Sequence, residues 1–185
     1  MSARKSLALG VACAAASAVL CFSASARADV SSWVYAGFGP ALLKDDTRSQ
    51  RWSLQLEAGM GTAPAPFVVG GMFRIQPIIG LGADLALLAR GAMGSFVRGD
   101  FGLALDVGAY QRFWGEGSTG GTASLVLGAP WGITCSVTGG YGTNDTRFGS
   151  VTLGLDFARL TVYRTTGQSW FKNPFVTDEL GRGPR

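Results

Sequence analysis

The stretch that decides the fold is Phe101 to Tyr110, Phe-Gly-Leu-Ala-Leu-Asp-Val-Gly-Ala-Tyr. Apolar side chains occupy every second position from Phe101 to Ala109, and small residues with one acid, Asp106, fill most of the positions between them. A period of two predicts a β-strand with two different faces. About ten residues is also the length of a tilted strand that crosses a bilayer.

The same pattern recurs along the chain, at 79–90, 131–142 and 151–156. Prolines, glycines and short polar runs separate the repeats and indicate turns. The sequence divides into eight strand-like segments, at 32–43, 51–61, 67–76, 78–90, 97–113, 122–129, 131–142 and 148–163. After Arg159 the alternation slips by one residue, which we interpret as a bulge or the edge of the bilayer. We therefore predict an all-β fold: a transmembrane, eight-stranded, antiparallel up-and-down barrel with short loops.

The composition fits apolar residues that are spread over alternating strands. Of the 185 residues, 47% are hydrophobic and only 15% are charged, against roughly 25% charged in average soluble domains. The mean hydropathy is +0.24. Beyond residue 28, no run reaches the 18 or more apolar residues of a transmembrane helix.

Residues 1–28 have the features of an export signal. A basic start is followed by an uncharged Ala/Ser-rich run and by the small-x-small triplet that ends at Ala28, so we expect cleavage there. Taking Arg4, Lys5 and Arg27 from the 16 basic residues leaves 13, against 12 acidic residues, and gives no reason to expect a nucleic-acid partner. Cys135 is then the only cysteine, so an internal disulfide is excluded. The expected domains are the signal peptide (1–28), the barrel (29–163) and an irregular C-terminal tail (164–185).

Charged residues gather in the phase that also holds the small residues. A basic group that faces lipid at mid-membrane costs about 2–4 kcal/mol, so these charges should face the lumen and pair with one another. The expected lumen charge network consists of Glu57, Arg74, Asp84, Arg90, Arg98, Asp100, Asp106, Arg112 and Asp156. Such a network has three readings: a packed polar core, a path for ions or small solutes, or a catalytic carboxylate pair.

Aromatic residues near the ends of the predicted strands fit interfacial girdles, which flank the apolar band of membrane barrels. The expected interfacial aromatics are Trp33, Tyr35, Trp52, Trp114, Trp131, Tyr141 and Tyr163. The chain has no histidine, which excludes histidine-based acid–base catalysis and histidine metal ligands. We expect no metal, no cofactor and no enzymatic activity.

Over about residues 32–163 the segments resemble the small eight-stranded outer-membrane β-barrel proteins of Gram-negative bacteria, in pattern and not through a diagnostic motif. The resemblance implies a location in the cell outer membrane, contact with outer-membrane lipid and insertion by the barrel-assembly machinery. Two features depart from the family: the chain continues for about twenty residues after Tyr163, and every loop is short.

These observations favour a non-enzymatic, porin-like membrane barrel with a structural or interaction role. A narrow ion or small-solute channel is the first alternative. The second is a soluble periplasmic barrel that binds an apolar ligand, which would require the opposite sidedness, with leucine, valine and phenylalanine pointing inward. An enzyme would need an acid pair in an open cleft.

Overall fold

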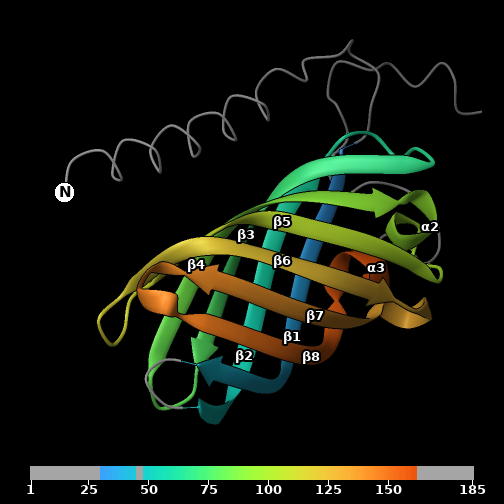
Figure 1. Cartoon of the computed structure of the whole chain (residues 1–185). Coiled ribbons are helices and arrows are strands. Elements are labelled where there is room, and N and C mark those ends of the chain that lie inside the picture. The colour runs from blue at the N-terminus through green and yellow to red at the C-terminus, as the bar shows by residue number, and fades with distance from the viewer. Residues whose placement is uncertain (1–29, 45–47, 162–185) are drawn as a thin grey trace, which may run out of the picture.

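The predicted eight-stranded antiparallel barrel is confirmed by the computed structural model, which describes residues 30–44 and 48–161. Eight antiparallel strands form a closed barrel in which each strand pairs with its neighbours in sequence and the last pairs with the first (Figure 1). The strands are β1 (Ser31–Lys44), β2 (Arg48–Gly61), β3 (Phe67–Ile78), β4 (Gly82–Met93), β5 (Gly102–Arg112), β6 (Ser118–Gly128), β7 (Ile133–Gly142) and β8 (Arg147–Asp156). The expected signal peptide and C-terminal tail lie outside the described residues.

The two faces of each strand point as the alternation predicts. On β5 the outward side chains Leu105 and Val107 are 54% and 53% exposed, whereas the inward Asp106 is 0% exposed. On β4 and β8, Leu87 and Leu153 are 70% and 63% exposed. The apolar phase therefore covers the outside of the barrel, and the polar phase fills its interior. A soluble barrel with an apolar lumen would have the opposite arrangement.

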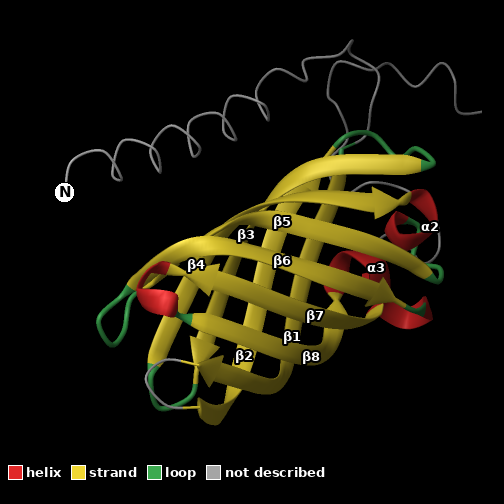
Figure 2. Ribbon diagram, in the orientation of Figure 1, coloured by secondary structure: helices red, strands yellow, loops and turns green. Residues whose placement is uncertain are grey.

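The two ends of the barrel differ. The terminal end holds the start of β1 and the end of β8, together with three short helices, whereas the distal end holds a fourth (Figures 1 and 2). The helices at the terminal end are α2 (Gly94–Val97), η1 (Pro130–Gly132) and α3 (Phe157–Thr161), and η2 (Thr143–Asp145) lies at the distal end. Within the described part of the chain, no helix is long and apolar enough to cross a membrane.

Two of the predicted strands run into helices. Residues 97–101 and 157–161 keep some alternation in sequence, but they leave the sheet: Val97 ends α2, residues 98–101 connect it to β5, and 157–161 form α3. The phase slip after Arg159 is thus a helix and not a bulge. Asp156 starts that helix because its Oδ1 accepts hydrogen bonds from the backbone N–H groups of Ala158 and Arg159, at 3.0 and 3.2 Å.

The interior has three layers. At the terminal end, side chains from five strands, α2 and α3 form an apolar cluster, which we call the terminal apolar cluster: Trp33, Val68, Ala92, Phe96, Val97, Ala104, Val126 and Ala158. Towards the distal end lies the distal apolar cluster: Leu43, Met72, Ile78, Ala86, Leu88, Tyr110 and Phe148. Buried polar and charged side chains occupy the space between these clusters.

Close contact between β8 and β1 requires glycine at Gly39 on β1 and at Gly154 on β8. A Cβ placed on Gly154 would lie 2.0 Å from the carbonyl oxygen of Ala36, which is far below a normal contact. A Cβ on Gly149, on the same strand, would meet no atom closer than 3.8 Å. Gly154 therefore permits the two backbones to approach, and Gly149 has no such role.

We predict that Gly154→Ala destabilises the barrel by about 1–3 kcal/mol, because the added methyl group must push two strands apart. The matched change Gly149→Ala should alter stability by less than about 0.5 kcal/mol. Unfolding in urea, followed by tryptophan fluorescence in lipid vesicles, measures both. Equal effects of the two changes would contradict the assigned packing.

Candidate functional site

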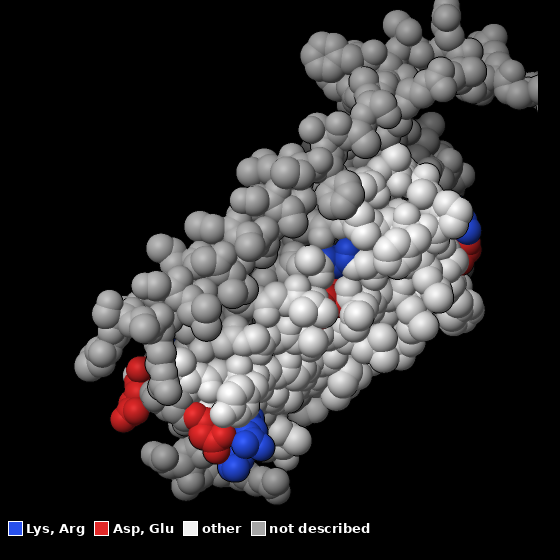
Figure 3. Space-filling model, turned by 45° about the horizontal axis from the view of Figure 1, so that its top comes forward, with Lys and Arg blue, Asp and Glu red and all other residues white. Residues whose placement is uncertain are grey.

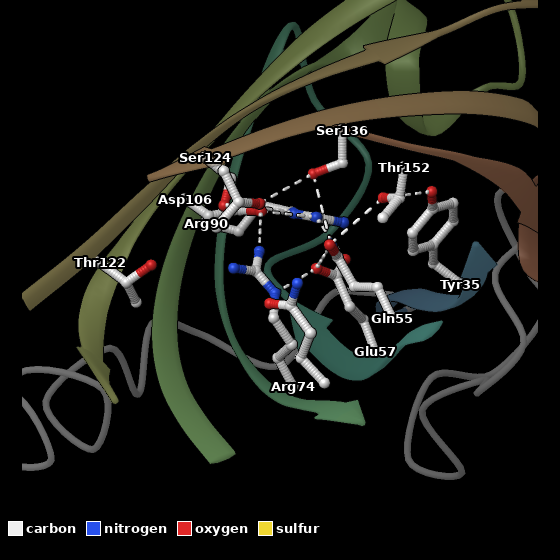
Figure 4. A network of polar contacts seen from close by, with 12 residues as sticks. Tyr35, Gln55, Glu57, Arg74, Arg90, Asp106, Thr122, Ser124, Ser136 and Thr152 are labelled. Carbon is white, nitrogen blue, oxygen red and sulfur yellow. Dashed lines mark hydrogen bonds and ion pairs between the residues drawn. The ribbon is translucent and has the colours of Figure 1, made fainter. Parts of the chain in front are cut away.

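Four buried charged side chains form a closed ring at the centre of the barrel, which we call the central ion ring (Figure 4). Arg90 donates to Asp106 through Nε and Nη2, at 2.7 and 2.8 Å, and to Glu57 Oε2 through Nη2 at 3.0 Å. Arg74 Nε donates to Glu57 Oε1 at 2.7 Å, and its Nη2 reaches Asp106 Oδ2 at 3.4 Å. Each acid thus contacts both arginines, and the two acids and two arginines balance in charge.

The ring follows from the order of the strands. Glu57, Arg74, Arg90 and Asp106 come from β2, β3, β4 and β5 in turn, all on the inward phase. Glu57 lies opposite Arg74, and Arg90 lies opposite Asp106, in the strand register. The two residues of each pair are 17 and 16 positions apart in sequence, which is the length of one hairpin. Opposite charges at that separation are the sequence feature that could have indicated these particular contacts.

Uncharged polar groups extend the ring towards β1, β7 and β8. Gln55 Nε2 donates to Glu57 Oε1 at 2.7 Å and to Ser136 Oγ at 3.3 Å. Thr152 Oγ1 donates to Gln55 Oε1 at 3.2 Å and also contacts the Tyr35 hydroxyl at 3.0 Å. These bonds satisfy buried polar groups that would otherwise cost free energy. Through these bonds the network connects seven of the eight strands, all except β6.

A second ion pair lies near the distal end. Arg112 Nε and Nη2 each donate to the Asp84 carboxylate, both at 3.2 Å, and Trp114 Nε1 donates to Asp84 Oδ1 at 2.9 Å. The Arg112 guanidinium lies 4.2 Å from the centre of the Trp114 ring. Trp114, expected at the interface, is half-buried and packs on the distal apolar cluster. It therefore helps to cover the lumen at this end.

At the terminal end, Arg159 is a buried residue that the sequence reading missed. Its guanidinium donates hydrogen bonds to four backbone carbonyl groups and one hydroxyl, and lies 4.5 Å from the Phe96 ring centre. The acceptors are the carbonyl oxygens of Phe96 (2.7 Å), Asp100 (2.8 Å), Ala129 (3.0 Å) and Ile133 (3.3 Å), and Thr134 Oγ1 (2.9 Å). One side chain thus ties α3 to the connections β4–β5 and β6–β7. An Asp followed by a lost alternation was the only sequence signal for this helix.

Three residues of the expected lumen network lie elsewhere or act differently. Arg98 and Asp100 are exposed in the connection between α2 and β5, because the chain leaves the sheet before Gly102. Asp156 is inward and 1% exposed, but it caps α3. Within the described residues its Oδ2 has no hydrogen-bond partner.

Two of the expected interfacial aromatics are inside the barrel. Trp33 and Tyr35 are 1% and 2% exposed: Trp33 belongs to the terminal apolar cluster, and Tyr35 to the polar layer. Gly37 and Gly39 share the phase of these two aromatics, and Phe38 lies in the other phase, so the alternation did not show which phase points inward. Trp52 on β2, Trp131 in η1 and Tyr141 near the end of β7 are exposed. Tyr163 lies outside the described residues.

Buried ion pairs of this kind hold structure more readily than they react. Glu57 and Asp106 are 4% and 0% exposed, and each accepts hydrogen bonds from two arginines. Among the residues that the structure describes, no group of three or more Cys, Asp or Glu side chains is placed to hold a metal ion. The arrangement orders the strands and fills the lumen.

Comparison with known proteins gives a likeness in structure but none in sequence. No family model matches the chain, and no curated protein matches it in sequence. Among solved structures, the chain is similar to Ail, the attachment invasion locus protein of Yersinia pestis, solved in complex with the heparin analogue sucrose octasulfate. The two are 12% identical with a TM-score of 0.45, over 70% of this chain and 98% of that one.

We predict that Arg90→Met destabilises the barrel by about 3–5 kcal/mol, because Asp106 then keeps only a 3.4 Å contact with Arg74 while it remains buried. The same change at the exposed Arg98 is the control and should cost less than about 0.5 kcal/mol. Urea unfolding in vesicles compares the two. A cost at Arg90 no larger than at Arg98 would contradict the ring.

For Arg159 we predict that Arg159→Lys costs about 2 kcal/mol or more, because an ammonium group cannot match the fork of donors that reaches five oxygens. The loss should be local to the terminal end. In the variant, hydrogen exchange at the backbone amides of residues 158 and 159 should therefore be faster than in the wild type, with little change at the amide of Asp106. Unchanged protection in α3 would show that the guanidinium does not hold it.

Proposed function

We propose that this chain is a non-enzymatic outer-membrane β-barrel with a structural or interaction role and a closed lumen. The observation that carries the proposal is the central ion ring, which is buried between two apolar clusters. The proposal has three parts: location in a membrane, absence of conduction and absence of catalysis.

The outer wall supports location in a membrane. Large apolar side chains are exposed on every strand, among them Leu54, Phe73 and Leu127, at 36%, 39% and 47%. On the face that Figure 3 shows, most charged atoms lie at the two ends of the barrel, and apart from a small charged patch between them the wall is uncharged. An apolar band between charged ends suits lipid, whereas a soluble protein rarely exposes so much contiguous apolar surface.

The filled interior argues against a channel. An eight-stranded barrel has an interior just wide enough for its own side chains. Here the arginines and acids of the ring neutralise one another, and apolar side chains lie on both sides of it. An ion on this path would have to break buried pairs and cross apolar layers. The same burial keeps a substrate away from Glu57 and Asp106, which argues against an enzyme.

Export, contact with outer-membrane lipid and insertion by the barrel-assembly machinery belong to this proposal. The expected signal peptide, residues 1–28, supports them from the sequence. Fractionation of expressing cells, followed by gel mobility with and without boiling, tests the location. We expect a detergent-extracted band whose mobility changes on heating. Recovery in the soluble periplasmic fraction would overturn the membrane assignment.

Planar bilayers test the closed lumen. We predict that the folded wild-type protein adds no regular current steps at either polarity, because mobile ions would have to pass the central ion ring. Heat-denatured protein and detergent alone are the controls. Unitary steps of constant size from the folded protein, absent from both controls, would favour the channel instead.

A further inference from the structure

The outward faces of the strands carry a single row of basic residues. Lys44 on β1 lies opposite Arg147 on β8 and opposite Arg48 on β2 in the strand register. Arg147 in turn lies opposite Tyr141 on β7. Of the described outward-facing strand side chains, Lys44 and Arg147 are the charged ones, and both are exposed at the distal end. We call Lys44 and Arg147, together with the neighbouring Tyr141, the basic row.

The members of the basic row are close enough to act together. The Arg147 guanidinium lies 5.4 Å from the Tyr141 ring centre and donates to Asp145 Oδ1 at 3.0 Å. The hydrogen bond and charge of Arg147 lower the pKa of Asp145, and the charge of Lys44 adds to this effect. The Arg147–Asp145 pair is 56% and 60% exposed, so the bond is weak and open to exchange.

Next to the basic row, towards the middle of the strands, the outer surface of the barrel is flat and apolar. Gly149 on β8 lies between Leu42 on β1 and Gly139 on β7. A Cβ on Gly149 or Gly139 would meet no atom closer than 3.8 or 3.9 Å, so packing within the chain does not require glycine at either position. Leu42, beside them, is 62% exposed. The two glycines leave a shallow apolar strip that leads up to the basic row.

We propose that the basic row binds the phosphate headgroup of an anionic membrane lipid, with an acyl chain on the glycine strip below. This proposal rests on the membrane location proposed above. Positive charge next to an apolar strip is complementary to an anionic head on an apolar tail, and basic side chains at a membrane surface attract anionic lipid. Because the row crosses three adjacent strands, β7, β8 and β1, it marks one side of the barrel rather than a ring around it.

Spin-labelled lipids in phosphatidylcholine vesicles test the site through the fraction of label immobilised by the protein. We expect the wild type to immobilise labelled phosphatidylglycerol more than labelled phosphatidylcholine. Lys44→Gln with Arg147→Gln should reduce that preference by about fivefold or more, and added salt should weaken it. Asp145→Asn should increase it, because a competing carboxylate is removed. Arg98→Gln, which removes a charge from the terminal end, is the matched control.

The outcomes separate the two proposals. Immobilised lipid without preference for phosphatidylglycerol would overturn the lipid site and leave the membrane barrel intact. A preference that survives in the double variant, or is lost equally in Arg98→Gln, would also overturn the site. So would displacement by inorganic phosphate at constant ionic strength, since it would show a free-anion site. No immobilised lipid of either kind would overturn the membrane location itself.

Discussion

The structure depends on the pairing of Arg90 with Asp106 and Glu57 inside a narrow barrel. Charges in such an interior are costly unless each one has partners, and the ring gives every member two. A shift of one residue in β4 would turn Arg90 towards the outside and leave two buried acids to share Arg74. The ring therefore fixes the register of four strands, and not only their stability.

The apolar clusters and the ring support one another. Apolar side chains at both ends keep water from the polar layer, so its ion pairs act in a medium of low dielectric constant. The side chains of the ring in turn fill the middle of the lumen. The polar layer also provides hydrogen-bond partners for Gln55 and Thr152, which apolar side chains could not do. Arg159 and Trp114 extend the closure to the two ends through contacts that alternation along the strands does not encode.

Sequence predicts this fold well where a strand has two unlike faces. On β5, Leu105 and Asp106 could be assigned to opposite faces from their chemistry alone, and the structure places them so. On β1, glycines follow the aromatics in one phase, and nothing local distinguishes inside from outside, so Trp33 and Tyr35 were misplaced. Arg159 could not be placed at all, because its acceptors are mostly backbone carbonyl groups far away in sequence. Every residue has such a group, so the sequence does not show which ones an arginine will contact.

The same alternation explains why charge is treated differently on the two faces. Inside, acids and arginines occur together at mid-depth, because each can neutralise another. Outside, a charge has no partner in the hydrocarbon, and its cost falls from about 2–4 kcal/mol at the midplane to 0–1 kcal/mol near the interfaces. Lys44 and Arg147 stand at the ends of their strands, where that cost is smallest and where lipid phosphates lie. Both side chains are positively charged, which matches an anionic lipid surface. If charge at this end served only solubility, a mixture of acidic and basic side chains would do as well.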